Sequence, residues 1–80
     1  MTQNIELLDV VALAADLPAE GLVRGEVGTV VERYPNNAFE VEFVAHDGYT
    51  YALTAIDGAL LLPLRQKQIH TEQKVVAFTA

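Results

Sequence analysis

Apolar and polar residues alternate most regularly in the segment AFEVEFV, residues 38–44. Phe39, Val41 and Phe43 alternate there with Glu40 and Glu42. Successive side chains of a β-strand point to opposite faces, so the segment predicts a strand with one face in the core and one in water. The segment GTVVERY, residues 28–34, is rich in β-branched residues and predicts the preceding strand. The residues PNN between them predict a hairpin turn.

The pattern continues after residue 44. HDG predicts a second hairpin turn, with Gly48 at the position that needs a positive φ. YTYALTA, residues 49–55, predicts a strand with Tyr49, Tyr51 and Leu53 on one face. IDG predicts a further turn, and ALLLPL, residues 59–64, predicts a short last strand. Pro63 cannot donate to a sheet ladder, so this strand should lie at an edge or end there.

The segment IELLDVVALAAD, near the N-terminus, fits two structures. A helix is favoured by the spacing of Ile5, Leu8, Ala12 and Ala15, whereas Val10, Val11 and Leu13 suit a strand. Locally both remain open. Because every later element is predicted to be a strand, we expect a strand here too, with a short helical turn within residues 2–9 as an alternative.

Turn residues recur about every ten positions, which is typical of small all-β domains. Five short strands after one long first loop predict a partly open, five-stranded SH3-like barrel over residues 1–64. Gly25 should supply a left-handed turn before the second strand, and Gly28 should allow close backbone approach at a corner. A phosphate-binding glycine loop would be followed by a helix, whereas here a strand follows.

Composition limits the chemistry. Eighty residues are enough for one core, and the chain has no cysteine. Glu40 and Glu42 lie on one strand face, an arrangement typical of a half-exposed strand. His46 and Asp47 lie in a predicted turn and could hold a metal only with further ligands from elsewhere in the chain. We therefore expect no enzyme activity, no cofactor, no metal and no small-molecule substrate.

Charge favours a protein partner. Residues 1–64 hold ten acidic and two basic residues, a net charge of −8. An acidic body repels phosphate backbones, so nucleic-acid binding is not expected. Tyr34, Tyr49 and Tyr51 lie near predicted strand ends, where rigid rings serve protein contacts well. We therefore take these three tyrosines as candidate partner-binding residues, with capping of the core as the alternative.

The C-terminal segment, residues 65–80, has a net charge of +2 and ends in the β-prone stretch KVVAFTA. We expect this tail to add a strand, to pack on an apolar surface or to mediate self-association. No basic residue precedes Arg24 and no long apolar run is present, so we expect no membrane contact and a cytoplasmic protein.

Several landmarks together resemble a bacterial family of uncharacterised proteins, domain-of-unknown-function family 4926. The similarity covers about residues 5–64 and rests on the segments DVVAL, LP, GL, GEVGTVV, EVEF, DG and LPL, together with Tyr34. The resemblance implies a small SH3-like fold, no catalytic activity and a protein partner encoded by a neighbouring small gene. It assigns no functional residues.

These observations predict a non-enzymatic protein-interaction module, acting as the partner or inhibitor of a neighbouring small gene product. The alternative is an RNA- or ribosome-associated barrel of the KOW type. A basic patch formed by Arg24, Arg33 and the tail would favour RNA, and a continuous acidic face would favour protein.

Overall fold

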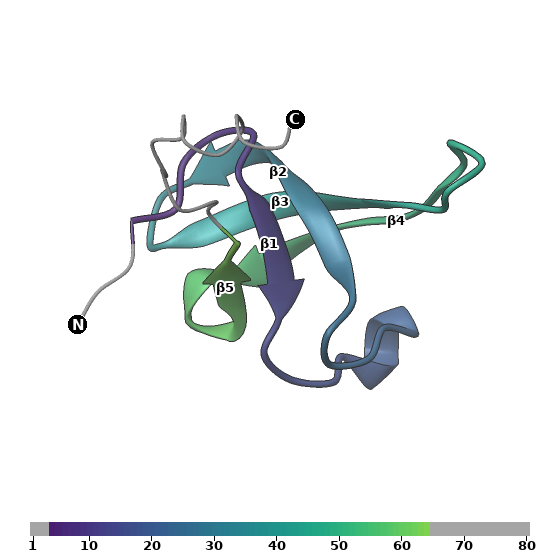
Figure 1. The fold of residues 1–80 in the computed structure, drawn as a ribbon. Helices are drawn as coiled ribbons and strands as arrows, with labels where there is room; N and C mark the ends of the chain where they lie inside the picture. Colours follow the sequence, from purple (N-terminus) through teal and green to yellow (C-terminus); the bar gives the residue numbers. More distant parts are fainter. Residues whose placement is uncertain (1–3, 65–80) are drawn as a thin grey trace, which may run out of the picture.

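A computed structural model of the chain describes residues 4–64, which form one five-stranded antiparallel sheet (Figure 1). In space the strands follow the order β4-β3-β2-β1-β5. The expected all-β fold is therefore confirmed, and the predicted tail, residues 65–80, lies outside the described residues. The elements are β1 (Val10–Leu13), η1 (Pro18–Glu20), β2 (Val27–Tyr34), β3 (Ala38–Val44), β4 (Thr50–Asp57), η2 (Gly58–Leu60) and β5 (Leu61–Pro63), where η marks a short 3-10 helix.

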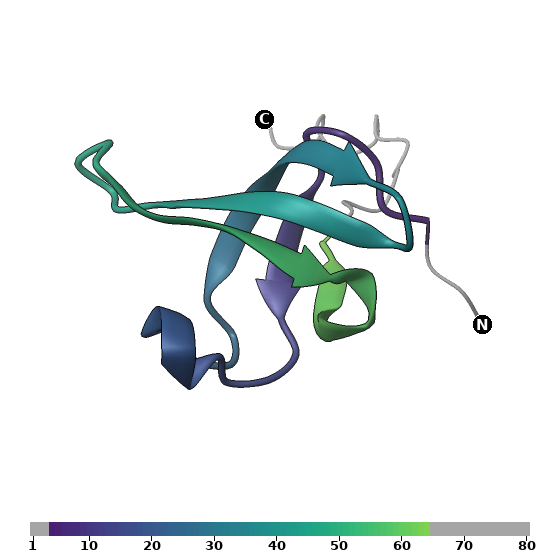
Figure 2. The ribbon, with the colours of Figure 1, turned by 180° about the vertical axis from the view of Figure 1, so that it is seen from behind.

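The sheet is strongly bent. β3 and β4 cross β1 at a steep angle in both views, so the sheet folds over its own inner face (Figures 1 and 2). β4 and β5 remain as the two edges, and η2 connects them. This arrangement is a partly open barrel. Within residues 4–64, no helix is long and apolar enough to cross a membrane.

The core lies on the inner face of the sheet. Phe39, Val41 and Phe43 of β3 are buried, as the alternation predicted, and Glu40 and Glu42 lie on the outer face. Each fully buried side chain of this size contributes about 1.5–3 kcal/mol. The other buried apolar residues come from all the remaining strands and from two loops: Ile5, Val11, Leu13, Leu22, Val30, Ile56 and Leu61.

The ambiguous N-terminal segment forms a strand at Val10–Leu13. Val11 and Leu13 are buried, whereas Val10 is exposed, so the burial follows the two-residue period of a strand. Before this strand the chain makes a tight turn, in which the amide of Asp9 donates to the carbonyl of Glu6 at 3.0 Å. Leu8 has a φ of 70°, a value that ends any helical continuation.

The predicted boundaries of the last two strands differ from the structure. β4 continues through Asp57, and the last strand begins at Leu61 instead of residue 59. The cause is local, because the carboxylate of Asp57 accepts the amide of Ala59 at 2.9 Å and caps η2. β5 is an edge strand and contains Pro63, as predicted.

Strict alternation also fails at the start of β4. The β3–β4 ladder changes register between Phe43 and Val44, so that Phe43 pairs with Ala52 but Val44 pairs with Thr50. Tyr51 is the extra residue of this bulge. Its ring centroid lies 6.3 Å from that of buried Phe43, whereas Leu53 lies opposite Glu42 on the outer face. Tyr51 and Leu53 therefore do not share one surface.

Candidate interaction groove

The three candidate tyrosines occupy different places. Tyr34 ends β2, and Tyr49 lies in the turn between β3 and β4. These two positions are at opposite ends of β3, which are separated by roughly 20 Å. Tyr51 lies near Tyr49 in sequence, but its ring contacts the core residue Phe43. The structure therefore does not unite the tyrosines into one surface.

Two of the tyrosines are held by glutamates. The hydroxyl of Tyr34 donates to Glu40 at 3.0 Å, and the hydroxyl of Tyr51 donates to Glu26 at 2.8 Å. The pKa of Tyr34 is raised above its ordinary value. The main cause is the hydrogen bond to Glu40, and partial burial and the charges of Glu40 and Glu32 contribute less. The hydrogen bond to Glu26, followed by partial burial, raises the pKa of Tyr51. Both rings therefore have a structural role at the ends of the sheet.

The turn glycines have distinct geometries. Gly25 and Gly48 have φ values of 93° and 91°, in the region that favours glycine. Gly28 is buried inside β2, where an added Cβ would lie 2.7 Å from Val41 Cγ1 and 2.8 Å from the carbonyl oxygen of Glu42. Gly28 is near the start of β2, and the chain continues after it as a strand and not as a helix. Gly25 and Gly28 therefore shape a corner of the sheet.

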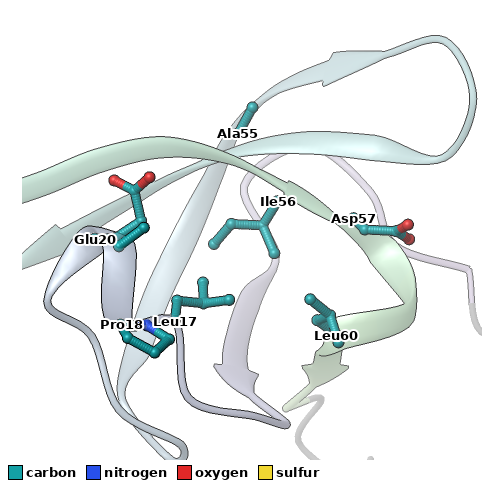
Figure 3. A pocket seen from close by; sticks show the side chains of 8 residues that line it. Leu17, Pro18, Glu20, Ala55, Ile56, Asp57 and Leu60 are labelled. Carbon is teal, nitrogen blue, oxygen red and sulfur yellow. The ribbon is translucent and has the colours of Figure 1, made fainter.

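A groove of about 240 Å³ lies elsewhere, between the first long loop and the end of β4 (Figure 3). Leu17, Ile56 and Leu60 turn toward its centre, and Pro18 forms one wall. The remaining lining residues are Ala19, Glu20, Ala55 and Asp57. The groove is therefore an apolar depression built by segments almost forty residues apart in sequence.

The walls of the groove are fixed by backbone hydrogen bonds. Leu17 and Leu22 exchange amide-to-carbonyl bonds of 2.8 and 3.1 Å, which close the loop around η1. Pro18 starts η1, and Gly21 ends it with a left-handed φ of 71°. On the other side, the amide of Gly58 donates to the carbonyl of Asn37 at 2.7 Å. These bonds fix the loop on one side of the groove and connect η2 to the β2–β3 turn on the other.

Two exposed carboxylates flank the groove. Figure 3 shows Glu20 at one end and Asp57 at the other, with the aliphatic side chains between them. The two arginines among residues 4–64 lie at Arg24, before β2, and at Arg33, near its end. Neither lines the groove. The site therefore combines an apolar floor with a negative rim.

The ionisable groups of the lining are the carboxylates of Glu20 and Asp57, and the residues of the described chain that line the groove include no hydroxyl, thiol, imidazole or amine. The structure also contains, within residues 4–64, no group of three potential metal-binding side chains. At about 240 Å³, the groove is smaller than the roughly 300–1,000 Å³ of ordinary small-molecule pockets. Its size suits one or two aliphatic side chains.

Sequence reasoning missed this groove. Leu17, Ile56 and Leu60 look like ordinary core or turn residues in the sequence, and only the bend of the sheet brings them together. The signals that could have indicated it were the LP step in a long first loop and the acidic residues beside two turns. The three tyrosines were predicted from the sequence as binding residues instead, because of their residue type.

Of the three comparisons with known proteins, only the one with family models found a match. No curated protein and no solved structure matches the chain. The family described as domain of unknown function (DUF4926) matches residues 7–69. This match covers all five strands, from β1 to β5, and both walls of the groove. The chain therefore belongs to the DUF4926 family.

Proposed function

We propose that the domain is a non-enzymatic protein-interaction module, and that its groove receives an aliphatic residue flanked by lysine or arginine in a partner protein. The observation that carries this proposal is the pairing of an apolar floor, made by Leu17, Ile56 and Leu60, with carboxylates at both ends. An aliphatic anchor would displace water from the floor, and flanking bases would meet Glu20 and Asp57.

The charge of the whole domain supports a basic partner. Residues 1–64 hold ten acidic and two basic residues, so the attraction extends beyond the groove and should speed association at low salt. A small acidic domain that covers a basic protein is the arrangement expected of the partner or inhibitor of a neighbouring gene product. Each exposed ion pair adds only about 0.2–1 kcal/mol, so the apolar anchor must supply much of the affinity.

RNA binding of the KOW type is the alternative, and the placement of the bases does not favour it. Arg24 precedes β2 and Arg33 lies near its far end, so the strand separates them by roughly 25–30 Å. Glu32 and Glu40 face one another across β2 and β3. Nucleic-acid platforms combine aromatic rings with nearby bases, and Tyr34 instead bonds to Glu40.

The proposal can be tested by selecting peptides from a displayed random library with the full chain as bait. We expect the selected peptides to share an aliphatic residue or proline flanked by Lys or Arg, and to bind more weakly as salt increases. Fluorescence anisotropy of one labelled peptide would then compare the natural chain with a Glu20→Gln/Asp57→Asn variant. Asp57→Asn keeps an acceptor for the cap of η2.

Two lost surface pairs together are worth about 0.4–2 kcal/mol, so affinity should fall by roughly 2- to 30-fold. A Glu40→Gln variant is the matched control, because Glu40 is an outer-face carboxylate that does not line the groove. Selected peptides without basic residues, or equal losses for the groove variant and its control, would contradict the proposal.

A further inference from the structure

A second surface, on the outer face of the sheet, is more apolar than an exposed strand face usually is. Ala12 of β1 pairs with Val27 of β2 on one side and with Leu62 of β5 on the other. Two residues further along the paired strands β1 and β5, the amide of Leu64 donates to the carbonyl of Val10 at 2.8 Å. These residues lie side by side on three strands, and we call them the aliphatic patch: Val10, Ala12, Val27, Leu62 and Leu64.

The four large members of the aliphatic patch are 43–48% exposed. A strand face in water normally carries polar residues, and the other half of the same outer face carries Glu32, Glu40 and Glu42 beside the single exposed Leu53. Grouped exposed aliphatic residues of this kind mark a surface that binds something. The patch shares no residue with the groove.

The aliphatic patch also borders an open sheet edge. β5 is the last strand in the order β4-β3-β2-β1-β5, and it consists of only Leu61–Pro63. Pro63 removes one backbone donor, but the outward side of this strand still has no neighbour within residues 4–64. An apolar face beside an open edge is a hazard that proteins usually cover.

We propose that residues 74–80 of the same chain, KVVAFTA, cover the aliphatic patch. The segment supplies three large apolar side chains, Val75, Val76 and Phe78, and each would contribute about 1.5–3 kcal/mol if fully buried. A seven-residue stretch with this composition aggregates readily when it stays in water. Covering the patch would bury both surfaces at once.

The connection is long enough and starts at the right place. The described chain ends at Leu64, which is itself a member of the patch. Residues 65–73 can span roughly 30 Å when extended, whereas β5 and β2 lie only about 10 Å apart across β1. A peptide from a partner would lack this tether and its high effective concentration.

Charge favours the same occupant. Residues 65–80 contain Arg65, Lys67 and Lys74 against Glu72, while residues 1–64 have a net charge of −8. The glutamates on the other half of the outer face lie beside the patch, since Thr29 of β2 pairs both with Val10 and with Glu42. Bases in the tail would therefore approach carboxylates when Val75, Val76 and Phe78 meet the patch.

The full chain with Phe78→Trp offers a direct test, because the protein has no tryptophan. The single indole should emit at shorter wavelength than in the same protein unfolded in urea, and acrylamide should quench it less. This emission should not change on dilution, since the contact lies within one chain. An indole with the emission and quenching of the unfolded protein would overturn the proposal.

Two patch variants and one control make the test specific. Leu62→Lys and Val27→Lys, each added to Phe78→Trp, should move the emission toward that of the unfolded protein, while circular dichroism shows an intact fold. Glu20→Gln in the groove should leave the emission unchanged. A shifted emission that survives both patch variants would contradict the proposal. A shifted emission that disappears on dilution, together with a dimer seen by light scattering, would also contradict the proposal. A second copy of the chain would then cover the patch.

Discussion

Gly28 shows how a single residue determines the corner of the sheet. It pairs with Val11 of β1, and its missing side chain leaves space that Val41 and Phe43 of β3 fill from the core. An added Cβ would lie 2.7 Å from Val41 Cγ1 and 3.0 Å from Phe43 Cδ2. The close approach of three strands at this position therefore depends on glycine.

We expect Gly28→Val to destabilise the free protein by roughly 1–3 kcal/mol or more, because a filled core must shift to admit the new side chain. Urea unfolding followed by circular dichroism would measure the change. Thr29→Val is the control, since it places the same residue type at the next position, on the half-exposed outer face. An unchanged midpoint for Gly28→Val would show that the corner is not tightly packed.

At the scale of elements, side-chain bonds join parts that the sheet ladder leaves apart. At the bulge in β4, the side chain of Tyr51 does not follow the alternation of the strand. The hydroxyl of Tyr51 donates to Glu26, which lies just before β2. The capped η2 joins β4 to β5. These contacts connect β4 with the start of β2 and with β5, while β4 and β5 themselves do not pair with each other.

The raised pKa of Tyr51 gives this link a pH dependence. The neutral phenol is favoured in the fold by its hydrogen bond to Glu26, so its contribution to stability is complete below the unfolded pKa of about 10. This contribution is lost as pH rises through the higher folded pKa. Ultraviolet titration should show that Glu26→Gln lowers the pKa of Tyr51 toward its ordinary value.

Glu42→Gln serves as the control for this titration, because Glu42 accepts from Thr50 and not from a phenol. It should leave the titration of Tyr51 unchanged. Comparison with Tyr51→Phe would assign the signal to this residue. If Glu26→Gln left the pKa of Tyr51 where it was, the charged carboxylate of Glu26 would not be the cause of the raised pKa.

Local pattern predicted the strands well, and for a physical reason. The alternation in β3 and the β-branched residues in β2 act within a few positions, so they are visible in the sequence. The bulge at Tyr51 depends on the pairing of β4 with β3, which the pattern within β4 does not contain. The groove was invisible for the same reason, since Leu17 meets Ile56 only after the sheet has bent.

At the scale of the whole molecule, three surfaces differ in chemistry. The groove is apolar with acidic ends, one half of the outer face is acidic, and the other half carries the aliphatic patch. The first two suit a basic protein partner, and the third suits the chain's own C-terminal segment. We propose that the partner protein binds in the groove.

The most direct measurement is an NMR titration of the isotope-labelled full chain with a peptide selected from the library. The largest amide shifts should fall on the groove-lining residues that have an amide hydrogen, which are residues 17, 19, 20, 55–57 and 60. Glu20→Gln/Asp57→Asn should reduce them at equal peptide concentration. Shifts centred on Tyr49 and the β3–β4 turn, or on the aliphatic patch, with the groove-lining residues unchanged, would contradict the proposal.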